Sequence, residues 1–154
     1  MSSSDVPTGP SPEAITRILL ERYPETVVVQ AMGATFFSLD KTHWPNYATI
    51  VTTDEHDEGV PSGLARPGVF RLNLGVSRET FQRLVGSAER PDYAAFDRVL
   101  PHPVYAKQHW VSILNPTQET FRDVVLPLVA EAHDRLAAVR ARHAPKAAHA
   151  RGSD

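Results

Sequence analysis

The chain has 154 residues, which is enough for one domain with a sizeable core and too little for two. Hydrophobic residues make up 42% of it and charged residues 22%, and the formal net charge is −2, a composition typical of a globular protein. The absence of cysteine excludes disulfides, thiolate metal ligands, iron–sulfur clusters and a cysteine nucleophile.

The small net charge hides an asymmetry along the chain. Residues 135–154 contain five Lys and Arg against one Asp, which gives +4 and leaves −6 for the rest. This basic segment has no interleaved aromatic residues, so we do not expect a nucleic-acid partner. The chain shows neither a signal-peptide pattern nor an apolar run of about 18 residues, so we expect a cytoplasmic protein with no membrane partner.

The two ends of the chain differ in composition from its middle. Residues 1–10 are rich in Ser, Pro and Gly, and residues 144–154 are small or basic, with no hydrophobic periodicity in either segment. We therefore predict a disordered N-terminal tail at 1–10, a single domain at 11–143 and a disordered basic tail at 144–154.

The first half of the domain predicts one helix followed by strands. Ser11 precedes a proline and an acid, which is typical of a helix start, and the helix should end at Tyr23. The β-branched and aromatic runs 26–32 and 35–39 flank Gly33 and predict a hairpin. Residues 47–53 predict a third strand, followed by a long acidic loop at 54–67.

A fourth strand at 69–74 carries the clearest pattern. Its alternation places Phe70, Leu72 and Leu74 on one face and Arg71 and Asn73 on the other. One face of the sheet should therefore pack in the core, while the other is polar.

The second half of the domain is mainly helical. Ser77 should cap a short helix, and residues 92–99 predict a second one. A fifth strand at 110–114 precedes Thr117, which should cap a long final helix disturbed by Pro127. The element order predicts an α+β fold, with an antiparallel sheet of about five strands and helices packed on one face. The uncovered face is then the natural place for a site.

The loop at 100–110 gathers polar and aromatic side chains. Prolines on both sides of His102 stiffen its backbone, which favours a preorganised site. His102, Tyr105 and His109 are candidate catalytic residues, because all three can exchange protons. Lys107 is a candidate anion contact and Trp110 a candidate apolar wall. The alternative is a rigid turn beside a core tryptophan.

Arginine and asparagine side chains provide a candidate ligand-binding surface. Arg71 and Asn73 should lie on the polar sheet face with Arg66 near its mouth, and a guanidinium can bind a carboxylate or phosphate through two hydrogen bonds. Alternatively, the arginine forms an ion pair with Asp54, Asp57 or Glu58, which folds the acidic loop over the sheet. If both interpretations hold, this loop acts as a lid over the ligand.

Metal and covalent chemistry have weaker support in the sequence. The possible metal ligands are His43, His56, His102 and His109 with Asp54 and Asp57, and their spacing matches no metal motif. Ser77 lacks the sequence surroundings of a catalytic nucleophile. His133 is expected on the surface of the final helix and needs no functional explanation. We expect no organic cofactor.

Several runs resemble a largely actinobacterial family of domains of unknown function, over about residues 14–132. The most specific is Arg66-Pro67-Gly68-Val69-Phe70-Arg71-Leu72-Asn73, joined by similar runs at 48–54, 100–105 and 110–116. More remotely, a proline-tyrosine segment followed by His-Trp, a strand and a final helix resembles the MmcQ/YjbR-like group, which implies a CyaY-like α+β fold. The acidic residues at 54–58 depart from that group, and neither resemblance implies an activity.

The leading hypothesis is a small-ligand-binding domain, with a possible acid–base activity on an anionic or carbonyl-bearing molecule. Arg66 and Arg71 would hold the ligand, and His102 or His109 would move a proton. One alternative is a protein-interaction module, such as a homodimer, that uses the open sheet face. Another is a metal-dependent enzyme with a His/carboxylate site.

Overall fold

The computed structural model describes residues 6–40, 45–53, 63–86 and 91–142. The first half contains α1 (Pro12–Arg22), β1 (Val27–Ala31), β2 (Ala34–Ser38), β3 (Asn46–Val51) and β4 (Arg71–Gly75). The second half contains α2 (Arg78–Val85), β5 (Leu100–Pro101), β6 (Trp110–Leu114), α3 (Gln118–Thr120) and α4 (Leu126–Arg142). A 3-10 turn at Ala106–Gln108 precedes β6, and a π turn at Phe121–Val125 joins α3 to α4.

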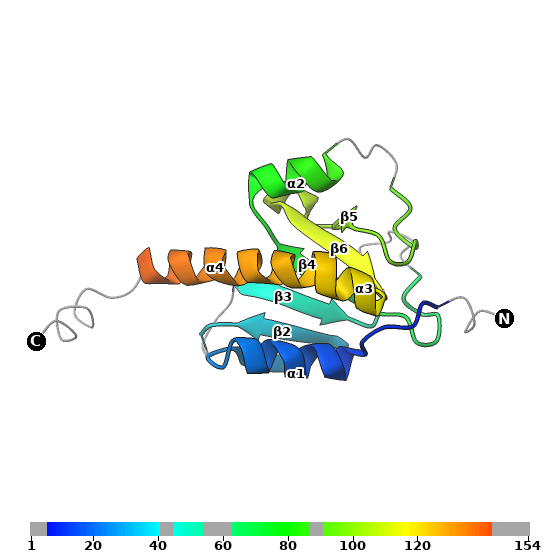
Figure 1. Cartoon of the computed structure of the whole chain (residues 1–154), viewed down its shortest axis with the longest axis horizontal. Helices are drawn as coiled ribbons and strands as arrows, with labels where there is room; N and C mark the ends of the chain where they lie inside the picture. Colours follow the sequence, from blue (N-terminus) through cyan, green and yellow to red (C-terminus); the bar gives the residue numbers. More distant parts are fainter. Residues whose placement is uncertain (1–5, 41–44, 54–62, 87–90, 143–154) are drawn as a thin grey trace, which may run out of the picture.

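The strands form one antiparallel sheet in the order β1-β2-β3-β4-β6-β5. The helices α1, α2 and α4 lie across one face of it (Figure 1). The expected α+β class, with helices on one face, is confirmed. The sheet has six strands and not about five, because Leu100 and Pro101 pair with Ser112 and Val111. Two residues are too few to show strand periodicity, so the sequence placed them in a loop.

The three predicted capping residues, Ser11, Ser77 and Thr117, cap helices as expected. The side-chain oxygen of Ser11 accepts the backbone N–H of Ala14 at 3.1 Å, and Ser77 accepts that of Thr80 at 3.1 Å. Thr117 caps the segment that leads into α4 in the same way. Because these bonds satisfy N–H groups that have no partner within the helix, the capping residues set where each helix begins.

Local backbone geometry explains two further features that the sequence predicts. Met32 and Gly33 both have positive φ, 53° and 75°, as the two-residue hairpin between β1 and β2 requires. Pro127 follows the π turn, in which the Leu126 N–H bonds to the Phe121 carbonyl five residues back. A proline nitrogen has no proton for the regular helical bond, so a widened turn before it is the expected disturbance.

The predicted helix at 92–99 is wrong. Asp97 has a left-handed φ of 57° and its carboxylate accepts the backbone N–H of Thr117 at 2.9 Å. Phe96 forms a parallel bridge to Leu114 in β6. The apolar spacing resembles a helix, but these contacts with distant residues hold the segment in an irregular conformation.

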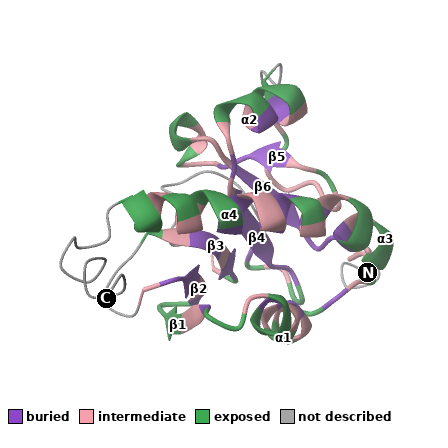
Figure 2. Cartoon of the chain, turned by 60° about the vertical axis from the view of Figure 1, so that its left-hand side comes forward, coloured by how far each residue is buried: buried purple, intermediate pink, exposed green. Residues whose placement is uncertain are grey.

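The main core fills the space between the sheet and the helices, and Figure 2 shows the buried central strands behind α4. Leu19 of α1 and Val129 of α4 are fully buried against sheet residues such as Phe37 and Leu72. No helix in the described part of the chain is long and apolar enough to cross a membrane.

The opposite sheet face is only partly open, which corrects the expectation of an uncovered face. Leu64 and Val69, in the segment before β4, form a second buried cluster with Leu114 of β6. Phe96 and Val6 pack against this cluster, so residue 6, which the sequence places in a tail, contacts the folded domain. One end of the face is covered and the other end is left for a pocket.

A contact between helices generates a test of stability. Glu131 of α4 accepts the backbone N–H of Ser77 at 2.6 Å and the hydroxyl of Thr80 at 2.8 Å. Burial opposes the charge of Glu131, but these hydrogen bonds outweigh it and hold the pKa of the carboxyl below its ordinary 4.5. Glu131→Gln should reduce the free energy of unfolding at pH 7 by about 1–2 kcal/mol, measured by urea denaturation.

The pH dependence follows from the sign of that shift. A lowered carboxyl pKa contributes stability above the unfolded-state value and loses it as pH falls through the folded-state value. The difference between wild type and Glu131→Gln should therefore shrink below about pH 4.5. Glu21→Gln, on the exposed side of α1, is the control and should leave stability unchanged. A difference that stays constant as the pH falls below 4.5 would contradict this account.

Candidate functional site

The strand register aligns one row of side chains across the open face. Phe36 of β2 lies opposite Thr49 of β3, Thr49 opposite Asn73 of β4, and Asn73 opposite Ser112 of β6. Since alternate residues of a strand share a face, Arg71 lies on the same side as Asn73. The polar face that the alternation of β4 predicts is confirmed.

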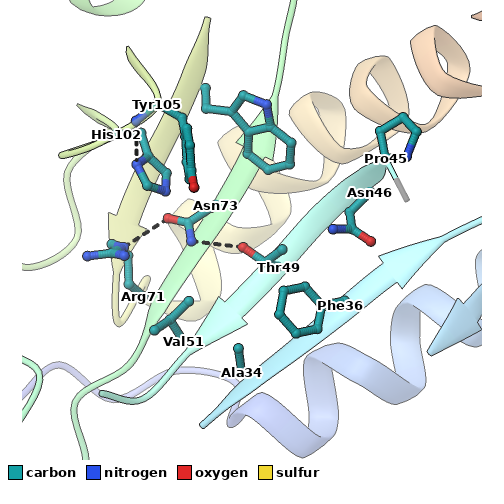
Figure 3. A pocket seen from close by; sticks show the side chains of 11 residues that line it. Ala34, Phe36, Pro45, Asn46, Thr49, Val51, Arg71, Asn73, His102 and Tyr105 are labelled. Atoms are coloured by element: carbon teal, nitrogen blue, oxygen red, sulfur yellow. Dashed lines mark hydrogen bonds between the residues drawn. The ribbon is translucent and has the colours of Figure 1, made fainter. Parts of the chain in front are cut away.

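Asn73 is the centre of a hydrogen-bond network on this face. Its Oδ1 accepts the Nε–H of Arg71 at 2.9 Å and the hydroxyl of Ser112 at 2.7 Å. Its Nδ2 donates to Thr49 Oγ1 at 2.9 Å (Figure 3). The amide orientation is set by these partners, because Arg71 can only donate. The network ties β3, β4 and β6 together through side chains.

Arg71 is almost fully buried, with 1% of its surface exposed. In the sheet register it lies between Val51 and Leu114, and its aliphatic part therefore has apolar neighbours. A buried guanidinium is tolerated only when it is hydrogen-bonded. The sequence identified the correct face for Arg71, while the structure buries it instead of projecting it into solvent.

His102 is held by the loop that follows β5. Its Nδ1 accepts the backbone N–H groups of Val104 at 2.9 Å and Tyr105 at 3.0 Å. A nitrogen that accepts two hydrogen bonds carries no proton, so the neutral ring has its proton on Nε2. The side chain is 5% exposed, and its orientation is set by the backbone of its own loop.

Two aromatic side chains surround His102. The Tyr105 ring centroid lies 5.0 Å from that of His102, and the Trp110 ring centroid 6.5 Å away and nearly perpendicular. Trp110 pairs with Gly75 of β4, where a Cβ would lie 3.0 Å from the indole. The missing side chain at Gly75 is what allows the indole to lie across the sheet.

These groups line a pocket of about 370 Å³. Its polar side is made by the network residues and the 102–105 loop, and its apolar side by β2, β3 and the indole. Figure 3 shows His102 and Tyr105 on one side and Phe36 on the other. The lining residues are Ala34, Phe36, Pro45, Asn46, Thr49, Val51, Arg71, Asn73, His102, Tyr105 and Trp110.

Five of the predicted site residues meet in this pocket, while others lie elsewhere. His109 has a left-handed φ of 68°, and its ring packs edge-on against Phe81 of α2 at 5.6 Å. Lys107 is exposed on the 3-10 turn and does not line the pocket. Asp54 and Asp57 lie outside the described residues, so the expected lid is not described.

Arg66 joins two loops and does not line the pocket. Its Nε donates to the Gly63 carbonyl at 2.7 Å, and its Nη2 to the Ala94 carbonyl at 3.1 Å. The guanidinium lies 4.6 Å from the centroid of Phe96. These contacts hold the segment that covers one end of the sheet face, which is a structural role.

Sequence reasoning missed the pocket residues contributed by β2 and β3. Phe36 and Thr49 lie on the correct strands, but a single strand pattern does not show which residues lie opposite each other. The alternation in β3 separates Thr49 and Val51 from the core residues Ala48 and Ile50, and this was the available signal.

No group of three or more His, Asp or Glu side chains capable of holding a metal occurs among residues 6–40, 45–53, 63–86 and 91–142. Two of the candidate ligands do not lie together, because His102 lines the pocket and His109 packs against α2. His43 and His56 lie outside the described residues.

The family comparison gives a result for nearly the whole chain. Residues 10–147 match a family described as "Family of unknown function (DUF6194)". The chain belongs to this family. No curated protein and no solved structure matches the chain significantly. Membership in a family of unknown function agrees with the resemblance in the sequence and assigns no reaction to the pocket.

In this DUF6194 member, His133 is buried and not on the helix surface as the sequence suggested. It is 8% exposed, stacks on Tyr23 at 4.1 Å and bonds through Nε2 to Glu25 at 2.6 Å. A backbone hydrogen bond and then the bond to His133 lower the pKa of Glu25. Nearby, burial raises the pKa of Tyr47 to about 12. This cluster joins α4 to the α1–β1 loop.

The tautomer of His102 provides a direct test of the site geometry. Long-range ¹H–¹⁵N NMR at neutral pH should show a protonated Nε2 and an unprotonated Nδ1. His102→Ala removes the acceptor for two backbone N–H groups and should lower the free energy of unfolding by about 1–3 kcal/mol. His102→Asn, which keeps an oxygen near the Nδ1 position, should recover part of that loss. A proton on Nδ1 would contradict the loop geometry.

Proposed function

We propose that this chain is a small-ligand-binding domain whose pocket takes an anionic or carbonyl-bearing molecule. The observation that carries the proposal is the hydrogen-bonding character of the pocket. The Oδ1 of Asn73 already accepts two bonds, from Arg71 and Ser112, so the remaining capacity of its amide is as a donor.

Two further lining groups add donors to the polar side of the pocket. The guanidinium of Arg71 contains only donor groups, and His102 has its proton on Nε2 because Nδ1 accepts two backbone bonds. Thr49 Oγ1 accepts from Asn73, which directs its own hydroxyl proton elsewhere. Donors gathered around one cavity favour a ligand rich in acceptors, such as a carboxylate or a carbonyl.

The apolar side of the pocket limits the rest of the ligand. Phe36 and Val51 form the wall on β2 and β3, and the Trp110 indole forms another. Flat apolar surfaces favour a planar or branched hydrocarbon part beside the oxygen-bearing group. At about 370 Å³, the cavity is at the small end of ligand pockets, which favours a compact molecule.

The geometry favours recognition over proton abstraction. A general base needs an unprotonated atom within reach of the ligand's proton. In His102 the unprotonated nitrogen accepts hydrogen bonds from the backbone N–H groups of Val104 and Tyr105, so it is not directed at a proton of the ligand. Tyr105, whose hydroxyl can donate and accept, is then the candidate for proton exchange in the pocket.

A cytoplasmic location fits a domain that binds a small metabolite. The proline-tyrosine segment before His109 and Trp110 supports a remote similarity to the MmcQ/YjbR-like group, and the run from Arg66 to Asn73 supports an actinobacterial character.

A ligand screen tests the proposal on the full chain. Probes should include aromatic carboxylates such as benzoate and 2-oxo acids such as phenylpyruvate, followed by two-dimensional NMR. A binding probe should shift the Asn73 side-chain amide and the Trp110 indole resonances. Thr49→Val and Tyr105→Ala should each weaken binding about tenfold, which corresponds to about 1.4 kcal/mol.

The control variant is Lys107→Ala, which removes an exposed cation of the same loop region that does not line the pocket. Its affinity should equal that of wild type. Thermal melts of all variants show that losses of affinity do not reflect unfolding. If no acceptor-rich probe shifts the pocket resonances at millimolar concentration, or if Lys107→Ala weakens binding as much as Thr49→Val, the proposal is wrong.

A further inference from the structure

The two edges of the sheet differ in how they are protected. The edge strand β5 has two residues, one of them Pro101, and both features discourage pairing with another strand. The other edge, β1, has the sequence Val-Val-Val-Gln-Ala, with no charge and no proline. In the described part of the chain, no strand pairs with the outer side of β1.

The register of the hairpin shows which backbone groups point outward from β1. Ala31 and Ala34 flank the two-residue turn, so they form a hydrogen-bonded pair. Pairs alternate along an antiparallel ladder, so Val29 is also bonded to β2, while Val28 and Gln30 direct their N–H and C=O groups away from it. Val28 and Gln30, the residues on the two sides of Val29, therefore each offer one outward N–H donor and one outward C=O acceptor.

Exposed apolar side chains occur on β1 and on the turn that follows it. Among the described residues, the exposed large hydrophobic side chains are Leu20 at 38%, Val29 at 48%, Met32 at 73% and Tyr105 at 52%. Val29 and Met32 lie on β1 and its turn, and Figure 2 shows β1 at the margin of the sheet in exposed and intermediate colours. Leu20 lies on the same face of α1 as Thr16, which lines a cavity with Gln30 of β1.

We propose that β1 pairs antiparallel with β1 of a second copy of this chain. The strand is its own complement. With the two-fold axis between the two Val29 residues, Val28 of each copy lies opposite Gln30 of the other, and both are outward-bonding positions. The pairing thus forms two hydrogen-bonded pairs of residues and places no charged side chains opposite each other.

This pairing would join the two six-stranded sheets into one continuous sheet. A two-fold axis normal to the sheet keeps both open faces on the same side, so both pockets would face the same direction. Val29 lies beside Phe36 in the register, and Phe36 lines the pocket, so the apolar row would run from one pocket to the other. The proposal is independent of what the pocket binds.

The contact is small compared with that of an obligate dimer, because it consists of one five-residue strand and a few side chains. Stable interfaces bury about 800 Å² on each partner, whereas a single strand pair buries less. We therefore expect a reversible dimer whose fraction rises with protein concentration.

The test measures the oligomeric state of the full chain by sedimentation equilibrium, from low micromolar to millimolar concentration. Wild type should show a monomer–dimer equilibrium. Gln30→Pro removes an outward N–H, and the two-fold symmetry removes it twice, so the dissociation constant should rise about tenfold or more. Val29→Lys places two like charges opposite each other and should do the same.

Matched variants separate loss of pairing from loss of folding. Gln30→Thr and Val29→Thr keep the backbone donors and the strand preference, and their dimerisation should stay close to that of wild type. Hydrogen exchange adds a local measurement, since the Val28 and Gln30 amides should gain protection with concentration. A wild type that is monomeric throughout, a dimer that survives Gln30→Pro, or amide exchange independent of concentration would each overturn the proposal.

Discussion

The open face of this sheet depends on a buried cation and the amide that orients it. Arg71 is 1% exposed and Asn73 is 1% exposed, and the Nε–H of the arginine donates to the Oδ1 of the asparagine. The same amide binds Thr49 on one neighbouring strand and Ser112 on the other. A buried polar network is stabilising only when its members are satisfied, so the position of each of these four side chains constrains the other three. The polar side of the pocket is a consequence of that constraint.

The two faces of the sheet have different roles, since one packs in the core and the other forms the pocket. On the helix side, apolar residues of α1, α2 and α4 form the main core. On the open side, a smaller cluster around Leu64 and Leu114 covers one end. Asn115 holds that cover in place, since its Oδ1 accepts the Phe70 N–H and its Nδ2 donates to the Gly68 carbonyl. The pocket is the part of the face that remains between this cover and the loop around His102.

Local patterns predicted most of the secondary structure, because their causes are local. The capping oxygens of Ser11 and Ser77, the turn at Gly33 and the disturbance at Pro127 all act within a few residues. The failures involve distant partners. The 92–99 segment has helical spacing, yet Asp97 bonds to Thr117, and His133 is buried because Tyr23 and Glu25, more than a hundred residues earlier, pack against it.

The sequence by itself determined the fold class, the face on which Arg71 and Asn73 lie and the stiffness of the loop around His102. These follow from the two-residue period of a strand and from the fixed φ of proline. Only the tertiary structure decided which residues meet. Strand register aligned Phe36 and Thr49 with Asn73, and backbone contacts turned His109 toward α2 while His102 stayed in the pocket. Such convergence depends on pairing between segments far apart in the chain, and the period of one segment carries no information about its partner.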